Sequence, residues 1–214
     1  MDFQTIDTPQ KAALTPSVMA VSQLWAGDLM EEGPPPAGRF SSANLKMGIA
    51  GQPPGFGITY VINADRPNHM NVLGTLGDAV VDEQWDSDPK DGSIHITGHV
   101  GSSAESLTIS SVDGNWSKFD GTIGNQQVHL ALSGPPGHAS IAWDGTMGGT
   151  PMHEELQFGA TGWHFSGAVG ASGTDLDVSI KAGPGKEKIV TGTGTVAGVP
   201  VDYAQDVAYG DTLA

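Results

Sequence analysis

The sequence predicts an all-β protein: an antiparallel β-barrel or sandwich of repeated hairpins of about 24 residues, with one short N-terminal helix. Three observations support this prediction. Glycine (31 residues) and proline (14 residues) make up about a fifth of the 214-residue chain, which is typical of a protein with many short strands and turns. A glycine motif recurs at nearly regular intervals. Apolar and polar residues alternate between the turn signals, as they do in strands with one covered face.

The first 40 residues differ from the rest of the chain. The motif TPS at 15–17 opens an amphipathic stretch, which predicts a helix from about residue 17 to 31. The proline-rich run GPPPAG at 33–38 then ends it. We therefore expect an N-terminal segment over residues 1–40, with a short helix and a proline-rich linker, followed by a repeated-hairpin β domain over 41–214. The sequence leaves open whether the helix caps a barrel end or packs outside.

The repeated motif has the form Gly-x-aliphatic-Gly/Ala, and a period near 24 residues matches two strands of about eight residues plus two turns. Residues 94–110 also match 163–179, and residues 74–84 match 145–155, which indicates two copies of a three-hairpin unit. A β-solenoid with coils of this length is the alternative. The first glycines of the motif are Gly74, Gly98, Gly121, Gly145, Gly167 and Gly194.

Strand periodicity is clearest in IHITGHV at 94–100, where the apolar residues and one glycine occupy alternate positions. WHFSGAV at 163–169 and IAWDGTM at 141–147 repeat this pattern. Turn signals such as DPKDG at 88–92 and GPPGH at 134–138 separate the runs. Because the connections are short, antiparallel hairpins are favoured over parallel crossovers.

The motif's first glycine falls in the apolar phase of each well-patterned strand. It either permits the bend that a closing sheet requires or leaves room for a ligand or another backbone. A barrel interior can enclose a small ligand, although core packing is the alternative role for apolar-phase tryptophans. The candidate ligand-binding residues are Gly98, Gly145, Gly167, Trp143, Trp163 and Met147.

Metal binding has weak candidates in DSDPKDGS at 86–93, where Asp86, Asp88 and Asp91 offer oxygen ligands that calcium prefers. The spacing lacks the alternating aspartates of a calcium loop, so an ordinary hairpin turn is the favoured interpretation. We expect the seven histidines on the solvent face. A cluster across neighbouring strands is left open, because cross-strand neighbours are not visible in a sequence.

Composition excludes several classes of protein. The 24 acidic and 9 basic residues give a net charge of −15, which disfavours nucleic-acid binding. No apolar run reaches the roughly 18 residues of a membrane helix, and few aromatic residues disfavour a membrane barrel. We expect a soluble protein that is cytoplasmic, or exported without a visible N-terminal signal peptide. The absence of cysteine removes thiol chemistry, and no motif indicates a cofactor.

For function, the sequence favours a non-enzymatic β-barrel-like binding protein that holds a small apolar or aromatic ligand in the sheet interior. One alternative is a structural or protein-interaction module with a filled core. A second is a small barrel enzyme such as a cyclase, isomerase or hydrolase. The partner is then a small apolar ligand or a protein. The oligomeric state is not predicted.

Overall fold

The structure, a computed structural model, describes residues 2–19, 43–49, 57–66, 68–112, 115–134, 140–182 and 187–208. This part of the chain contains fourteen strands and the short helix α1, and a second helical turn begins at Pro16 and is described as far as Met19. The elements are α1 (Pro9–Ala13), β1 (Ala43–Ile49), β2 (Gly57–Arg66), β3 (His69–Leu76), β4 (Ala79–Ser87), β5 (Ile94–Val100), β6 (Ser103–Val112), β7 (Asn115–Ile123), β8 (Gln126–Ser133), β9 (Ser140–Met147), β10 (Thr150–Gly159), β11 (Gly162–Val169), β12 (Ser172–Ala182), β13 (Glu187–Val196) and β14 (Val199–Ala208).

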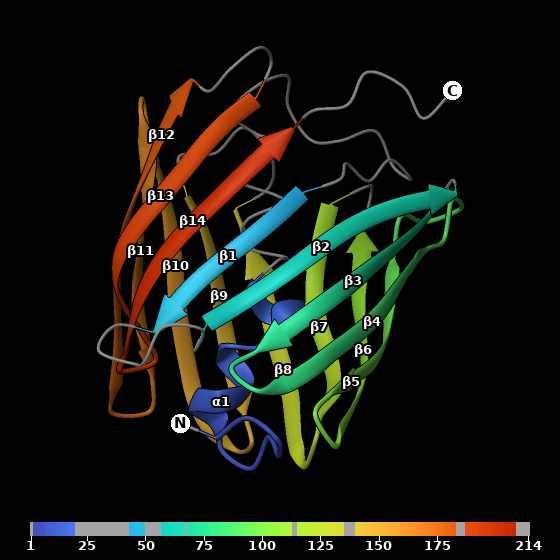
Figure 1. The fold of residues 1–214 in the computed structure, drawn as a ribbon. Coiled ribbons are helices and arrows are strands. Elements are labelled where there is room, and N and C mark those ends of the chain that lie inside the picture. Colours follow the sequence, from blue (N-terminus) through green and yellow to red (C-terminus); the bar gives the residue numbers. More distant parts are fainter. Residues whose placement is uncertain are drawn as a thin grey trace.

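The strands form one antiparallel barrel in which each strand pairs with the next along the chain. β1 pairs with β14 as well as with β2, so the strand order returns to its start and the barrel closes (Figure 1). The predicted all-β antiparallel class with a short N-terminal helix is confirmed, and the barrel is the form adopted. The solenoid alternative is wrong, because consecutive strands pair with each other instead of stacking as coils.

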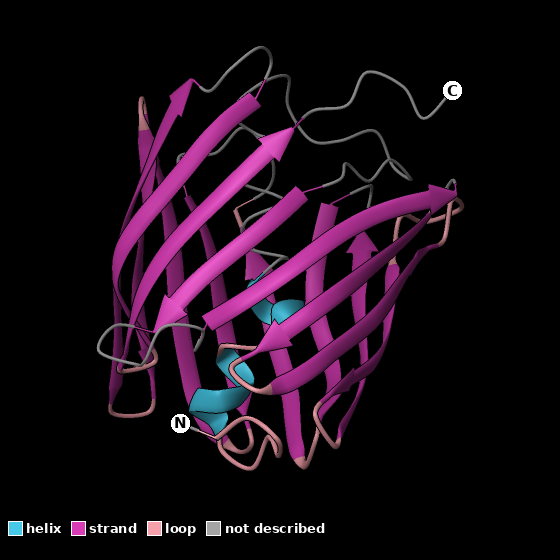
Figure 2. Ribbon diagram, viewed as in Figure 1, coloured by secondary structure: helices cyan, strands magenta, loops and turns pink. Residues whose placement is uncertain are grey.

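The barrel interior is apolar and the outer face is polar. β8 alternates buried and exposed residues along its whole length, and β5 follows the same period. Side chains of a strand point alternately to the two faces of a sheet, so this pattern buries one apolar set per strand in a single core. Figure 2 shows the strands that form the wall around it. The alternation in the sequence therefore determines which residues line the interior.

Six two-residue hairpin turns lie at one end of the barrel, which we call the turn end. In five of them the first turn residue is a glycine with φ between +57° and +61°, a conformation that glycine adopts without steric cost. The sixth turn uses Ala197 (φ +48°) and Gly198 (φ +76°). The last position of the repeated motif is thus a hairpin turn. The turns are at 77–78, 101–102, 124–125, 148–149, 170–171 and 197–198.

The first glycine of the motif allows the neighbouring strand to lie close to its own strand. A Cβ added at Gly145 would lie 1.9 Å from the carbonyl oxygen of His129 on β8. Comparable contacts of 2.1 Å exist at Gly98 and Gly167. The space that a side chain would need is therefore already occupied by backbone.

A short helix, α1, precedes the predicted one. α1 begins after Thr8, whose hydroxyl accepts a hydrogen bond from the Lys11 backbone N–H at 3.3 Å, and Pro9 occupies its first turn. These are ordinary start signals, but a helix of five residues depends on packing for its stability, so periodicity did not reveal it. The start of the predicted helix at residue 17 falls within the second helical turn, and residues 20–31 lie outside the described residues. No helix in the described residues is long and apolar enough to cross a membrane.

Candidate functional site: the barrel interior

Residues 2–19, which we call the N-terminal plug, close the turn end of the barrel (Figure 1). The plug runs along the hairpin turns. The Gln4 side chain donates to the Asp78 carbonyl at 3.0 Å, and the Ile6 backbone N–H donates to the Ser103 hydroxyl at 2.7 Å. A Cβ at Gly101 would lie 2.6 Å from the Gln4 carbonyl oxygen, so the glycine at this turn also allows the plug backbone to approach closely. The plug residues buried in the core are Phe3, Ile6, Ala12, Ala13, Leu14, Val18 and Met19.

Three glutamates point into the barrel: Glu83 on β4, Glu105 on β6 and Glu154 on β10. Their exposed fractions are 0%, 3% and 1%. Gly98 on β5 lies directly between Glu83 and Glu105 in the strand register. Among the residues whose burial the structure describes, no lysine or arginine is buried, so these residues give the interior acids no buried cationic partner of that type.

Two stretches of similar sequence, within 74–110 and 145–179, give this arrangement twice, with one difference. In the second copy Glu154 lies opposite Gly167, and Gly167 lies opposite Thr174. The first copy therefore has a Glu–Gly–Glu row across three strands and the second has a Glu–Gly–Thr row. The two halves of the barrel thus differ in chemistry at equivalent positions.

Glu154 is hydrogen-bonded. Thr174 donates its hydroxyl hydrogen to Glu154 Oε1 and accepts a hydrogen bond from the Ala197 backbone N–H at 2.9 Å. Burial raises the pKa of Glu154 to about 7, and the Thr174 hydrogen bond partly offsets this effect. Thr174 therefore links the buried acid to the β13–β14 turn.

Substituting Thr174→Val is expected to lower the free energy of unfolding by roughly 1–3 kcal/mol, because it leaves a buried carboxyl and a buried N–H without their partner. Urea denaturation at pH 7 measures the change. Thr97→Val on the exposed face of β5 is the matched control and should change the free energy by no more than about 0.5 kcal/mol. Equal effects of the two substitutions would contradict a specific role for Thr174.

The carboxyl groups of Glu83 and Glu105 have few hydrogen-bond partners. Trp85 donates its indole N–H to Glu83 Oε2 at 3.0 Å, whereas Glu83 Oε1 and both carboxyl oxygens of Glu105 have no hydrogen-bond partner of normal geometry. Burial raises the pKa of Glu83 to about 7. Burial, followed by the neighbouring charge of Glu83, raises the pKa of Glu105 well above its ordinary value. This pair is the least satisfied polar group in the described interior.

The candidate ligand-binding residues are only partly brought together. Trp143 and Met147 are buried on β9, where Gly145 is exposed, and Trp163 is buried on β11, where Gly167 is half-buried. The ring of Trp143 contacts Phe165 edge to face, with centroids 5.8 Å apart. Gly98 lies on β5 in the other copy of the repeated unit, beside the glutamate pair. The aromatic residues therefore form one group and Gly98 belongs to a different region.

Of the candidate calcium ligands, Asp88 and Asp91 lie in the β4–β5 loop and accept hydrogen bonds from groups of that loop, whereas Asp86 lies on β4. Asp88 Oδ1 accepts from the Lys90 backbone N–H at 2.8 Å, and Asp91 Oδ1 accepts from the Ser93 N–H and hydroxyl at 2.8 and 2.7 Å. These Ser93 hydrogen bonds lower the pKa of Asp91. Asp86 Oδ1 lies 2.7 Å from His69 Nδ1. Among the described residues, no three or more His, Asp or Glu side chains are placed to hold a metal ion.

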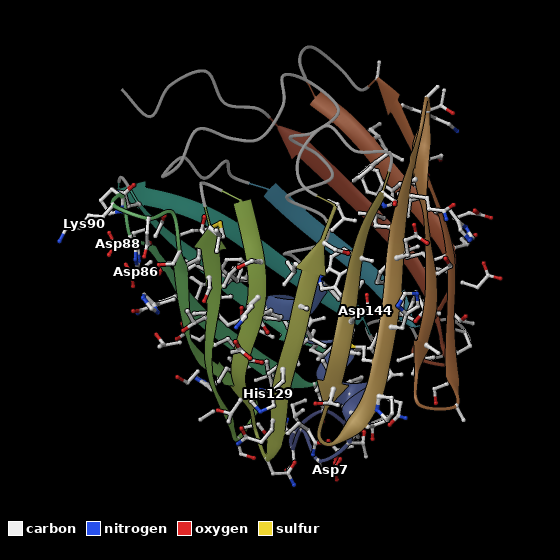
Figure 3. The ribbon with its side chains drawn as sticks, turned by 180° about the vertical axis from the view of Figure 1, so that it is seen from behind. Asp7, Asp86, Asp88, Lys90, His129 and Asp144 are labelled. Atoms are coloured by element: carbon white, nitrogen blue, oxygen red, sulfur yellow. The ribbon has the colours of Figure 1, made fainter. Side chains whose placement is uncertain are left out.

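The histidines pair with aspartates on neighbouring strands. In His129–Asp120 and His164–Asp177 the Nδ1–Oδ1 distances are 3.1 and 2.8 Å, and Figure 3 shows His129 on the outer face. Such cross-strand pairs stabilise a sheet. His69 is the buried exception, and His138 lies outside the described residues. The pairs in register are His69–Asp86, His95–Asp86, His99–Asp82, His129–Asp120, His153–Asp144 and His164–Asp177.

The interior glutamates were not predicted from the sequence, although a signal was present. Glu83 falls between Val81 and Trp85 in the apolar phase of its strand, and Glu105 precedes Leu107 in the same way. A charged residue in an apolar phase is the kind of buried polar group that requires an explanation.

Comparisons with known proteins add no relative: no family model, no curated protein and no solved structure matches this chain.

Proposed function

We propose that this protein is a non-enzymatic binding protein that holds a small apolar or aromatic ligand inside the barrel, at the end opposite the N-terminal plug. An eight-stranded barrel is just wide enough for its own side chains to fill, whereas barrels of sixteen or more strands leave a channel. Fourteen strands lie between these limits. The described interior wall is lined with apolar and aromatic side chains, as small-molecule sites usually are.

The observation that carries this proposal is the residual exposure of two apolar residues on β11 and β12. At the turn end, Leu76, Ile123 and Val169 are completely buried. Farther from the plug, Trp163 and Val178, which are opposite each other in the register, each keep 6% exposure. A ligand at this level would contact Trp163 and the neighbouring aromatic residues.

A fluorescence titration with N-phenyl-1-naphthylamine, a neutral aromatic probe, tests the proposal. We expect saturable binding by the wild-type protein and at least about tenfold weaker binding by Trp163→Ala, which corresponds to about 1.4 kcal/mol. His164→Ala changes the next residue on the same strand, whose side chain is 40% exposed on the outer face, and should bind like the wild type. A wild-type protein that leaves the probe's fluorescence unchanged would contradict the proposal and favour a structural or protein-interaction module with a filled core.

A small barrel enzyme is the second candidate, because buried acids with raised pKa values are common in active sites. Glu83 and Glu105 are the relevant groups. Both are buried, and neither is open to a substrate in this conformation. Binding therefore remains the function that the geometry supports best.

A further inference from the structure

The second helical turn of the plug covers the Glu83–Glu105 pair. Ser17 is completely buried; its backbone N–H is directed to Glu83 and its hydroxyl to Glu105, where each favours the ionised carboxyl. The same hydroxyl also contacts the Thr15 hydroxyl at 3.0 Å. A segment that is separate in sequence thus covers the least satisfied polar group of the described interior.

The other charged groups described near the Glu83–Glu105 pair do not offset its negative charge. Asp82 on β4 raises the pKa of Glu83 further. The opposite position on β5 is His99, which shares the outer face with Asp82 and does not face the pair. Lys118 and Asp120 of β7 lie on the outer phase of their strand.

The charges of the plug itself also do not face the pair. Lys11 forms an ion pair with Asp7 at 2.8 Å, and Asp7 is half exposed. Asp2 is exposed and its Oδ1 accepts from the Gln4 backbone N–H at 2.8 Å. Among the described residues, an ionised Glu83–Glu105 pair therefore faces the neutral groups of Ser17 and Trp85.

We propose that the N-terminal plug is a pH-dependent closure of the barrel, which is seated while the Glu83–Glu105 pair carries a proton and is released when both carboxyls are ionised. A protonated carboxyl can donate to its neighbour and share the buried space. Two buried carboxylates repel each other and lose their hydration. Movement of the plug restores water to both.

The direction of the pH dependence follows from proton binding. In the seated state the pKa of Glu83 is about 7 and that of Glu105 is well above its ordinary value of 4.5. In the released state both carboxyls are hydrated and have ordinary pKa values. The seated state therefore binds more protons, so raising the pH through 7 and above favours release, and acidification favours closure.

The second copy of the duplicated unit supplies an internal control. Glu154 occupies the position equivalent to Glu83, but it is paired with the neutral Thr174 in place of a second acid. Its ionisation creates no carboxylate pair under the plug. Glu154→Gln should therefore leave the pH dependence of closure unchanged.

Thiol accessibility tests the closure, because the chain contains no cysteine. Ala13→Cys places one thiol at a buried position of the plug, where the residue is 1% exposed. Its rate of reaction with 4,4′-dithiodipyridine is measured from pH 6 to 9 and divided by the rate of N-acetylcysteine at the same pH. We expect protection to fall at least about tenfold over this range, which is about 1.4 kcal/mol. Adding Glu83→Gln and Glu105→Gln should abolish this fall, and adding Glu154→Gln should not.

A second thiol distinguishes plug release from unfolding of the barrel. Leu156→Cys lies in the barrel wall, where the residue is 1% exposed, and denaturant-dependent circular dichroism shows whether the barrel itself stays folded. Equal loss of protection at both thiols with loss of the folded signal would overturn the proposal. Constant protection of the Ala13→Cys thiol, or an unchanged pH dependence in the double glutamine variant, would also overturn it. If that double variant does not fold, the single variant Glu105→Thr is used, because threonine is the residue at the equivalent position 174. It should reduce the fall in protection between pH 6 and 9. An unchanged fall in this variant overturns the proposal.

Discussion

The free energy of unfolding of the wild-type protein should fall by several kcal/mol between pH 5 and pH 8. Glu83 and Glu154 have pKa values of about 7 in the folded protein against an ordinary 4.5, so the folded state binds more protons than the unfolded state in this window. Stability then decreases as the pH rises from 4.5 through 7. Each group contributes on the order of 3 kcal/mol. Urea denaturation at closely spaced pH values measures the slope.

Single substitutions test which buried glutamate causes this decrease in the free energy of unfolding with pH. Glu154→Gln should make the loss of stability between pH 5 and 8 smaller by roughly 3 kcal/mol, whatever its effect at one pH. Glu155→Gln is the matched control, because Glu155 is the next residue on β10 and the hydrogen bonds of its exposed side chain lower its pKa. Its substitution should leave the slope between pH 5 and 8 unchanged. A wild-type slope in Glu154→Gln would show that Glu154 is not protonated in the folded interior.

Substituting Gly145→Ala should lower the free energy of unfolding by at least about 3 kcal/mol or prevent the barrel from forming. The new Cβ would lie 1.9 Å from the His129 carbonyl oxygen, and the backbone has φ +158°. Both β8 and β9 would have to move apart, which breaks ladder hydrogen bonds at the centre of the wall. Circular dichroism and urea denaturation measure the loss.

The control for this substitution is Gly173→Ala on β12. A Cβ added there has no atom within 4 Å, and the position has no unusual φ. It should change stability by no more than about 0.5 kcal/mol. If both alanine variants were equally stable, close strand approach would not be the reason for the glycine at position 145.

Much of the barrel wall was predictable because strand periodicity and turn chemistry are local. The alternation in IHITGHV at 94–100 places Ile94, Ile96 and Val100 inside, as observed. The glycines at the ends of the motifs became hairpin turns, since a tight turn needs positive φ. In the candidate site, Trp143 and Trp163 were assigned correctly to the apolar phase.

Local sequence patterns specify the strands, their hairpin order and the faces they bury, because these depend on the period of two residues and on turn geometry. Closure of the sheet depends on tertiary packing, since Ala43 pairs with Val207 from the far end of the chain. Tertiary packing also decides that the plug fills the turn end and that Glu83 and Glu105 lie on either side of Gly98. Contacts between distant segments arise from packing, and no local pattern in a single sequence specifies which buried acids become neighbours.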